Sequence, residues 1–210
     1  MPQDAPGSVE NPVAVRPAPR ALALDGRLAD WRGVAPLPAP YEDEPSGSLR
    51  LAWQAGGLHG ALAVKDARIG VRPDAPWAGD ALELFLERDA AGAGAITPAA
   101  VQIILTPAAD PSAGDGPRSC GVWCSREGDP AGARAEAVWR PTADGYVMEF
   151  HIPAEGLAPA KPEPRAMIGF HYSWNDDGRP VEQFFCDKDS GGFRTPARWG
   201  RIRLVGEGAD

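Results

Sequence analysis

Apolar residues recur at every second position in short stretches of this chain, and this two-residue period constrains the fold more than any other feature. Side chains alternate between the two faces of a β-strand, so such a stretch presents one apolar face to a core. Residues 48–54 and 58–65 alternate in this way, and the intervening Ala55-Gly56-Gly57 is typical of a hairpin turn. The pair therefore predicts an antiparallel hairpin.

The rest of the chain repeats this pattern of short strands between turns. The chain contains 25 Gly and 23 Pro residues, which favour turns over long helices. Further strands are expected at residues 21–24, 81–87, 101–105, 119–125, 133–140, 146–152, 167–175, 181–186 and 199–205. Residues 154–157 predict a single helical turn. The pattern predicts an all-β fold, an antiparallel β-sandwich of roughly ten or eleven short strands.

The length of 210 residues fits one domain. Residues 1–20 are rich in Pro, Ala and polar residues and predict a disordered leader, residues 21–206 the sandwich, and residues 207–210 a tail. The leader lacks the apolar stretch of a secretory signal, so the protein either stays inside the cell or has a signal that this sequence does not include. No apolar run is long enough for a membrane span.

Charge and cysteine content exclude some partners. The net charge of −8 and the absence of a basic stripe argue against nucleic acid. Three cysteines are not a disulfide framework. Cys120 and Cys124 either form a disulfide or serve as small apolar residues. No histidine accompanies them at a spacing that suits zinc.

The stretch from Pro76 to Glu87 is the candidate for function. A tryptophan in a turn, Trp77, precedes a strand whose leucines face one way, while Glu83 and Phe85 face the other. Sugar-binding surfaces combine a flat ring, which stacks on the sugar, with acceptors for its hydroxyl groups. The alternative is that Trp77 caps the core and the glutamates are merely solvated.

Six motifs, in order along residues 21–205, resemble family 9 carbohydrate-binding modules and their sugar-binding, DOMON-like relatives. They are Leu24-Asp25-Gly26-Arg27-Leu28-Ala29-Asp30-Trp31, the hairpin from Leu49 to Val64, Trp77-Ala78-Gly79-Asp80-Ala81-Leu82-Glu83-Leu84-Phe85, the stretch from Asp144 to Pro153, Ile168-Gly169-Phe170 with Asn175-Asp176, and Trp199-Gly200-Arg201-Ile202.

The resemblance implies a β-sandwich that binds carbohydrate without catalysis, a terminal sugar ring being clamped between two tryptophans. By position, Trp77 is one clamp ring, Glu83 accepts from hydroxyl groups, and Asn175 is a further polar contact. Asp80 belongs to the same motif. Stacking on an indole gains dispersion energy, and a carboxylate orients the sugar through charge-assisted hydrogen bonds.

The chain departs from the family pattern at two places. The second clamp ring is expected just after Asn175, where this chain has no tryptophan, so Phe185 or Trp174 is the candidate substitute. A basic residue expected on the strand around Gln102 is also absent. Family members often carry calcium, and the candidate ligands, which solvated loop acids would equally explain, are Asp187, Asp189 and the pair Asp176-Asp177.

Three other functions stay open. Glu83 and Glu149 would be the carboxylates of a glycosidase, which needs two at a set separation. Related sandwiches hold b-type haem, and the candidate axial ligands here are Met148, Met167, His151 and His171. A structural or adhesion module with a degenerate sugar site is the third. Of the other tryptophans, Trp53, Trp139 and Trp199 are expected in the core, and Trp123 is left unassigned. Trp174 is in phase with Phe170 and Tyr172, which favours the core over a ligand contact.

Overall fold

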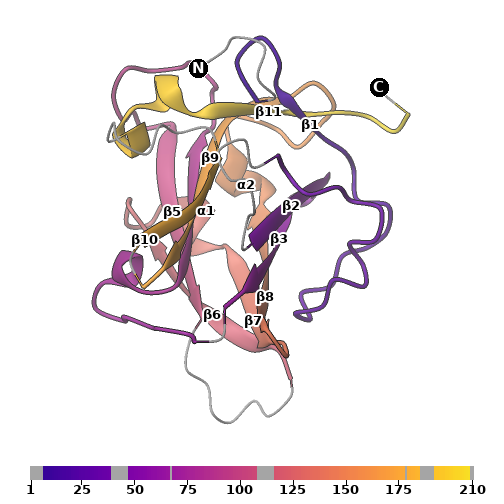
Figure 1. Ribbon diagram of the computed structural model, residues 1–210. Coiled ribbons are helices and arrows are strands. Elements are labelled where there is room, and N and C mark those ends of the chain that lie inside the picture. The colour runs from indigo at the N-terminus through magenta and orange to yellow at the C-terminus, as the bar shows by residue number, and fades with distance from the viewer. Residues whose placement is uncertain are drawn as a thin grey trace.

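Two β-sheets pack face to face in the computed structural model of the protein, which describes residues 7–38, 47–66, 68–107, 116–177, 179–184 and 192–208 (Figure 1). The first sheet has the order β1 (Val13–Val15), β11 (Gly200–Leu204), β9 (Met167–Asp176), β4 (Ala81–Glu87), β5 (Ala100–Pro107) and β6 (Arg118–Cys124), and β10 (Arg179–Phe184) also pairs with β9. The second has the order β7 (Glu136–Pro141), β8 (Gly145–Pro153), β3 (Gly57–Lys65) and β2 (Gly47–Gln54).

Strand β6 joins the two sheets, because it pairs with β5 in the first and, through Arg118 and Ser119, with β7 in the second. The named strands pair antiparallel except for β1, which lies parallel to β11. The helical elements are short: α1 (Pro130–Ala133), α2 (Ala154–Leu157), and the 3-10 turns η1 (Pro76–Ala78), η3 (Gly192–Arg194) and η4 (Pro196–Arg198). None of the helices in the described ranges is long and apolar enough to cross a membrane. The predicted all-β sandwich is confirmed, as is the helical turn at 154–157.

The apolar faces of the two sheets form the core. The alternating leucines of β4, Leu82, Leu84 and Leu86, are fully buried. Trp53, Trp139 and Trp199 are buried as predicted. Burying such side chains supplies most of the free energy that favours folding, roughly 1.5–3 kcal/mol for each large apolar residue.

The N-terminal segment differs from the prediction. Residues 21–24 form no strand, and Val13–Val15, inside the predicted leader, forms β1 on the edge of the first sheet. Val15 is buried, and an isolated bridge joins Pro17 to Trp53. The local sequence does not predict this strand, because its partner, β11, lies at the far end of the chain. A parallel pair also lacks the hairpin turn that would indicate it in the sequence.

Residues 16–34, here called the N-terminal arm, cover the outer face of the second sheet. Trp31 of the arm packs with Ala52 and Ala61 in a small second core. Beneath the arm, Glu149 Oε2 accepts hydrogen bonds from the backbone N–H groups of residues 25, 26 and 27 at 3.0, 2.6 and 3.3 Å, and Glu149 Oε1 accepts one from Trp31 Nε1 at 2.6 Å. Glu149 is therefore the anchor of the arm.

Cys120 and Cys124 are free, so the disulfide alternative is wrong. Both lie on β6, four residues apart, which is about 13 Å along an extended strand. A disulfide needs Cα atoms within about 7 Å. Burial raises the pKa of both thiols, which keeps them protonated and unreactive.

Candidate functional site

One row of side chains crosses four strands on the outer face of the first sheet. Ser173 of β9 pairs with Glu83 of β4, Glu83 pairs with Ile104 of β5, and Ile104 pairs with Trp123 of β6. Directly paired residues point to the same face, and neighbouring strands lie about 4.8 Å apart. The sheet therefore places Trp123 two strands away from Glu83, at about 10 Å between their Cα atoms.

A chain of polar side chains lies at the Glu83 end of this row. Ser173 Oγ donates to Asn175 Oδ1 at 2.8 Å, Asn175 Nδ2 donates to Glu83 Oε1, and Gln102 Nε2 donates to Glu83 Oε2. Burial raises the pKa of Glu83, and the hydrogen bonds from Asn175 and Gln102 offset only part of this effect. The structure thus brings together Glu83 and Asn175, two of the residues that the sequence singled out.

Two exposed indole rings stand beside this polar chain. Trp77 lies in η1, the turn that leads into β4, and is 49% exposed, while Trp123 is 38% exposed. Their ring centroids are 5.9 Å apart and their planes meet at 69°. Trp77 is therefore not a core cap. The sequence left Trp123 unassigned, and only the register from β4 through β5 to β6 could have placed it here.

Trp174, which was also predicted for the site, lies elsewhere. Trp174 is 1% exposed, and its Nε1 donates to Tyr146 Oη at 2.8 Å between the sheets, so it cannot contact a sugar on the surface. It alternates with Asn175 along β9 and so faces inward. Phe185 lies outside the described residues.

The remainder of the outer face of β4 is closed. Phe85 is buried against Trp199 and His171, with ring centroids 5.6 and 5.1 Å away. Glu87 is buried as well, and it pairs with Arg201 at 3.3 Å. Phe85 and Glu87 are therefore structural residues. The accessible part of this face is the end near Trp77.

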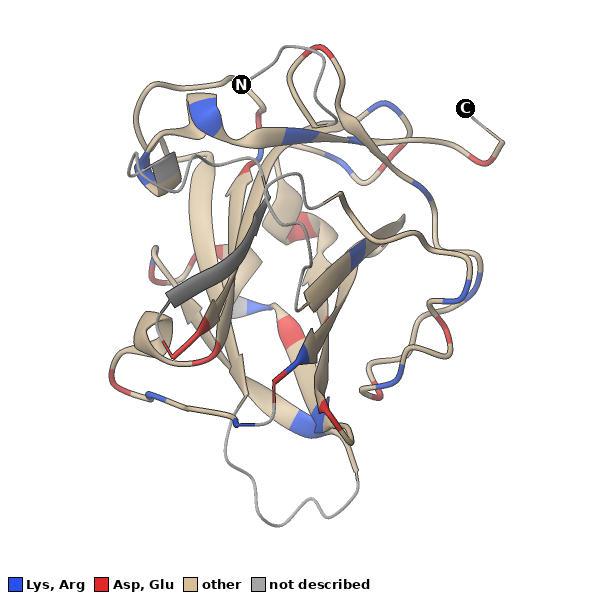
Figure 2. Cartoon of the chain, in the orientation of Figure 1, with Lys and Arg blue, Asp and Glu red and all other residues tan. Residues whose placement is uncertain are grey.

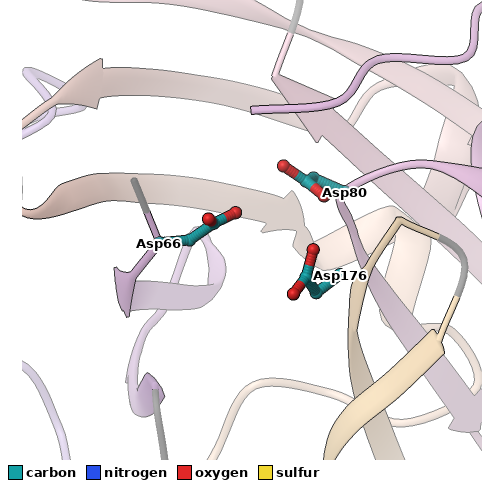
Figure 3. A group of neighbouring side chains, drawn as sticks. All are labelled: Asp66, Asp80 and Asp176. Atoms are coloured by element: carbon teal, nitrogen blue, oxygen red, sulfur yellow. The ribbon is translucent and has the colours of Figure 1, made fainter. Parts of the chain in front are cut away.

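Asp80 lies next to this end, in a group of three carboxylates with Asp66 and Asp176 (Figure 3). One oxygen from each lies within 4.8 Å of the others, and the side chains point toward a common space. Asp80 accepts backbone hydrogen bonds from Gly70 and Asp177 at 2.9 and 3.0 Å.

The three carboxylates suit a hard cation. Asp66 Oδ2 is buried and has no hydrogen-bond partner. Burial raises the pKa of Asp80, and the negative charges of Asp66 and Asp176 raise it further. Calcium takes oxygen ligands at 2.3–2.6 Å, so two of its ligands lie at most about 5 Å apart, which this group satisfies. Asp176 was among the predicted candidates, whereas Asp187 and Asp189 lie outside the described residues.

The glycosidase pair is not formed. Glu83 lies on the outer face of the first sheet and Glu149 on the outer face of the second, beneath the N-terminal arm. The whole core separates them, and sheets in a sandwich pack about 10 Å apart before the outward-pointing side chains are added. They cannot flank one glycosidic bond.

The candidate haem ligands are also dispersed. Met148 is fully buried in the core, while His151 stacks on His59 outside the second sheet, with ring centroids 4.4 Å apart. His171 packs against Phe85 outside the first sheet. Met167 shares the outer face of β9 with His171 but lies four residues away, about 13 Å along the strand. No pair of these residues faces a common haem position.

Basic side chains are spread over many elements of the described chain. Figure 2 shows Lys and Arg scattered over strands and loops in this view. Near the candidate site, Arg72 is exposed and pairs with Asp177 at 3.4 Å. The acidic group of Asp66, Asp80 and Asp176 lies at the adjoining ends of β3, β4 and β9.

Comparison with known proteins agrees with this architecture. The profile of the family described as "Carbohydrate family 9 binding domain-like" matches residues 34–207, so the chain belongs to this family. Endo-1,4-beta-xylanase A of Thermotoga neapolitana is 22% identical over 193 residues, and the enzyme of that name from Thermotoga maritima is 23% identical over 161 residues. The matches cover 87% and 75% of this chain but only 17% and 14% of the xylanases.

Solved structures show the same fold. A family 9 carbohydrate-binding module from Caldicellulosiruptor kristjanssonii in complex with cellotriose has a TM-score of 0.72 at 19% identity, covering 93% of this chain and 94% of that one. The module from this organism in complex with glucose has a TM-score of 0.71 at 17% identity, covering 94% and 98%. A putative carbohydrate-binding protein from Bacteroides uniformis has a TM-score of 0.58 at 13% identity, covering 91% and 98%.

Proposed function

We propose that this protein is a non-catalytic carbohydrate-binding module. Its site is the end of the first sheet near Trp77, where the exposed rings of Trp77 and Trp123 form the aromatic part and the half-buried Glu83, held in place by the buried Asn175, forms the polar part. The observation that carries the proposal is the placement of two exposed indole rings beside a hydrogen-bonded carboxylate on one sheet face. Membership of the family, and relatives that bind glucose and cellotriose, support it.

The physical roles follow from the chemistry of sugars. The C–H face of a pyranose is apolar and stacks on an indole, which gains dispersion energy and releases water. The hydroxyl groups at the ring's edge need fixed partners, and Glu83 offers acceptor oxygens that Asn175 and Gln102 already hold in place. Because these groups are ordered before binding, little conformational entropy is lost on binding.

The site differs from a parallel clamp. Two rings at 69° with centroids 5.9 Å apart touch each other and leave no gap for a sugar between them. A sugar therefore stacks on the open face of one ring while the other ring forms a wall at its edge. This arrangement suits a terminal or single sugar unit lying against a corner.

A calcium ion fits the group of Asp66, Asp80 and Asp176, and the family resemblance implies one. These carboxylates would hold it, and the ion would supply a positive charge that joins the ends of β3, β4 and β9 next to the site. Its role would be structural, because it would fix the segment from Asp66 to Asp80 that carries Trp77.

The test is isothermal titration of the purified protein with glucose, cellobiose and xylobiose, beside Trp77→Ala. We expect saturable heat with at least one sugar and its loss in the variant, while circular dichroism shows an unchanged fold. Absence of heat with all three sugars from a folded protein would overturn the proposal and favour a structural module with a degenerate site.

A further inference from the structure

The carboxylate of Glu83, at the centre of the candidate site, is bonded by neutral groups in the described part of the chain. Among the described residues, both oxygens of Glu83 are bonded by amide groups, those of Asn175 and Gln102, and no Lys or Arg forms an ion pair with it. Gln102 occupies the strand on which the family resemblance led us to expect a basic residue. An amide supplies a donor there but no charge.

The pattern of hydrogen bonds fits the ionised form of Glu83. Each carboxylate oxygen accepts from an N–H group, so a proton on either oxygen would compete with a donor already present. Burial disfavours the charge and raises the pKa of Glu83. A ligand that places a positive charge beside Glu83 therefore stabilises its ionised form more than a neutral ligand does.

Two further features favour a cationic ligand. The acidic group of Asp66, Asp80 and Asp176 lies at the adjoining end of β4 and gives this end of the molecule a negative charge that attracts cations. The guanidinium group of Arg72 is paired with Asp177. The indole faces of Trp77 and Trp123 attract cations through the negative potential of their π-systems.

We propose that the site selects sugars by charge, binding a cationic amino sugar best, a neutral hexose less well and an anionic uronic acid least. The ammonium group of the amino sugar lies against Glu83 while its ring stacks on an indole. This inference rests on the proposed function, because it names the sugar class for the same site.

The test is a set of titrations with glucosamine, glucose and glucuronic acid at pH 6, where the amine is protonated and the uronic acid ionised. Calcium is kept at one concentration throughout. We expect glucosamine to bind about tenfold more tightly than glucose, the ratio typical where a charge-assisted hydrogen bond replaces a neutral one, and glucuronic acid at least about tenfold more weakly. The differences should shrink as salt is added.

Variants distinguish the effect of the Glu83 charge on sugar affinity from the effect of the protein's net negative charge. In Glu83→Gln and in Gln102→Arg, the ratio of glucosamine to glucose affinity should fall to about one, because one loses the charge and the other supplies an internal cation. Glu163→Gln makes the same change as Glu83→Gln on an exposed residue that precedes the opposite end of β9, and it should keep the full ratio.

Each outcome is decisive. Equal affinities for glucose and glucosamine would overturn the inference and leave the proposed function intact. A preference for glucosamine that persists in Glu83→Gln would also overturn it, because the charge would then act from elsewhere. If none of the three sugars binds to the folded protein, the proposed function fails, and this inference fails with it.

Discussion

Trp77 and Trp123 meet edge to face, with ring centroids 5.9 Å apart and planes at 69°. One comes from the turn before β4 and the other from β6, the strand that joins the two sheets. Both rings are exposed, and Ile104, which pairs with Trp123, is buried beside them. The two rings therefore form a corner, an L-shaped aromatic surface on the sheet, and not two parallel faces with a gap between them.

This corner predicts that each ring is needed for binding. We expect Trp123→Ala to weaken sugar affinity about tenfold or more, as removal of a central aromatic contact usually does, with a loss of stability of only about 1 kcal/mol because the ring is partly exposed. Phe193→Ala is the control, since Phe193 is an exposed aromatic residue on η3 that is not part of the proposed site. Calorimetry with the best sugar measures the change. An unaltered affinity in Trp123→Ala would show that the sugar uses Trp77 alone.

The strands could be predicted because alternation is a local property. Each strand face repeats every two residues, so β2, β3, β4 and β8 are readable one at a time. β1 was missed since its partner is distant, and residues 21–24 were wrongly assigned because a short apolar run does not by itself show a neighbouring strand.

The candidate site was only half predictable for the same reason. Trp77 and Glu83 share one motif, and the family resemblance added Asn175. Trp123 joins them through a register across three strands, which nothing in its own neighbourhood reveals. Trp174, a candidate for the second clamp ring, faces the core, because adjacent strand residues face opposite ways and its neighbour Asn175 faces the other side.

Glu149 should be essential to stability and unimportant for sugar binding. Its side chain accepts hydrogen bonds from three backbone N–H groups and from Trp31, and Glu149→Ala would leave these donors without a buried partner. We expect a loss of about 3 kcal/mol in the free energy of unfolding, measured by urea denaturation. Glu163→Ala should stay within about 0.5 kcal/mol of the parent. A loss of sugar affinity in folded Glu149→Ala would contradict the placement of the site on the other sheet.

His59 should make the protein less stable in mild acid. Burial, together with the charge of the stacked His151, lowers the pKa of His59 to about 4, and its Nδ1 atom has no hydrogen-bond partner. The unfolded chain binds a proton there near pH 6.5, whereas the folded chain does so only near pH 4. Stability from this group is therefore complete above pH 6.5 and lost as the pH falls toward 4.

The measurement is the free energy of unfolding between pH 7 and pH 4 for the parent and His59→Gln. We expect the slope with pH to decrease by up to one proton in the variant. Glu83, Asp80 and Glu149, whose pKa values are raised by burial, contribute with the opposite sign, so only the difference between the two proteins is informative. Equal slopes would show that His59 titrates normally.

Calcium should stabilise the protein through Asp66, Asp80 and Asp176. A ligand that binds only the folded state at about a hundredfold excess over its dissociation constant adds about 2.7 kcal/mol. Burial raises the pKa of Asp80, and repulsion among the three carboxylates, which an ion would remove, raises it further. Thermal denaturation with calcium and with a chelator should therefore give clearly different midpoints.

The Asp66→Asn variant distinguishes stabilisation by bound calcium from a general effect of charge on stability. Removing one carboxylate relieves the repulsion, so the variant in chelator should be as stable as the parent or slightly more so, yet its midpoint should no longer rise with calcium. Asp144→Asn changes the same residue type in the exposed turn between β7 and β8 and should keep the full calcium response. Acidification should also abolish the response, because a protonated Asp80 loses its charge and its affinity for the ion. A calcium shift that survives in Asp66→Asn would place the ion at other ligands.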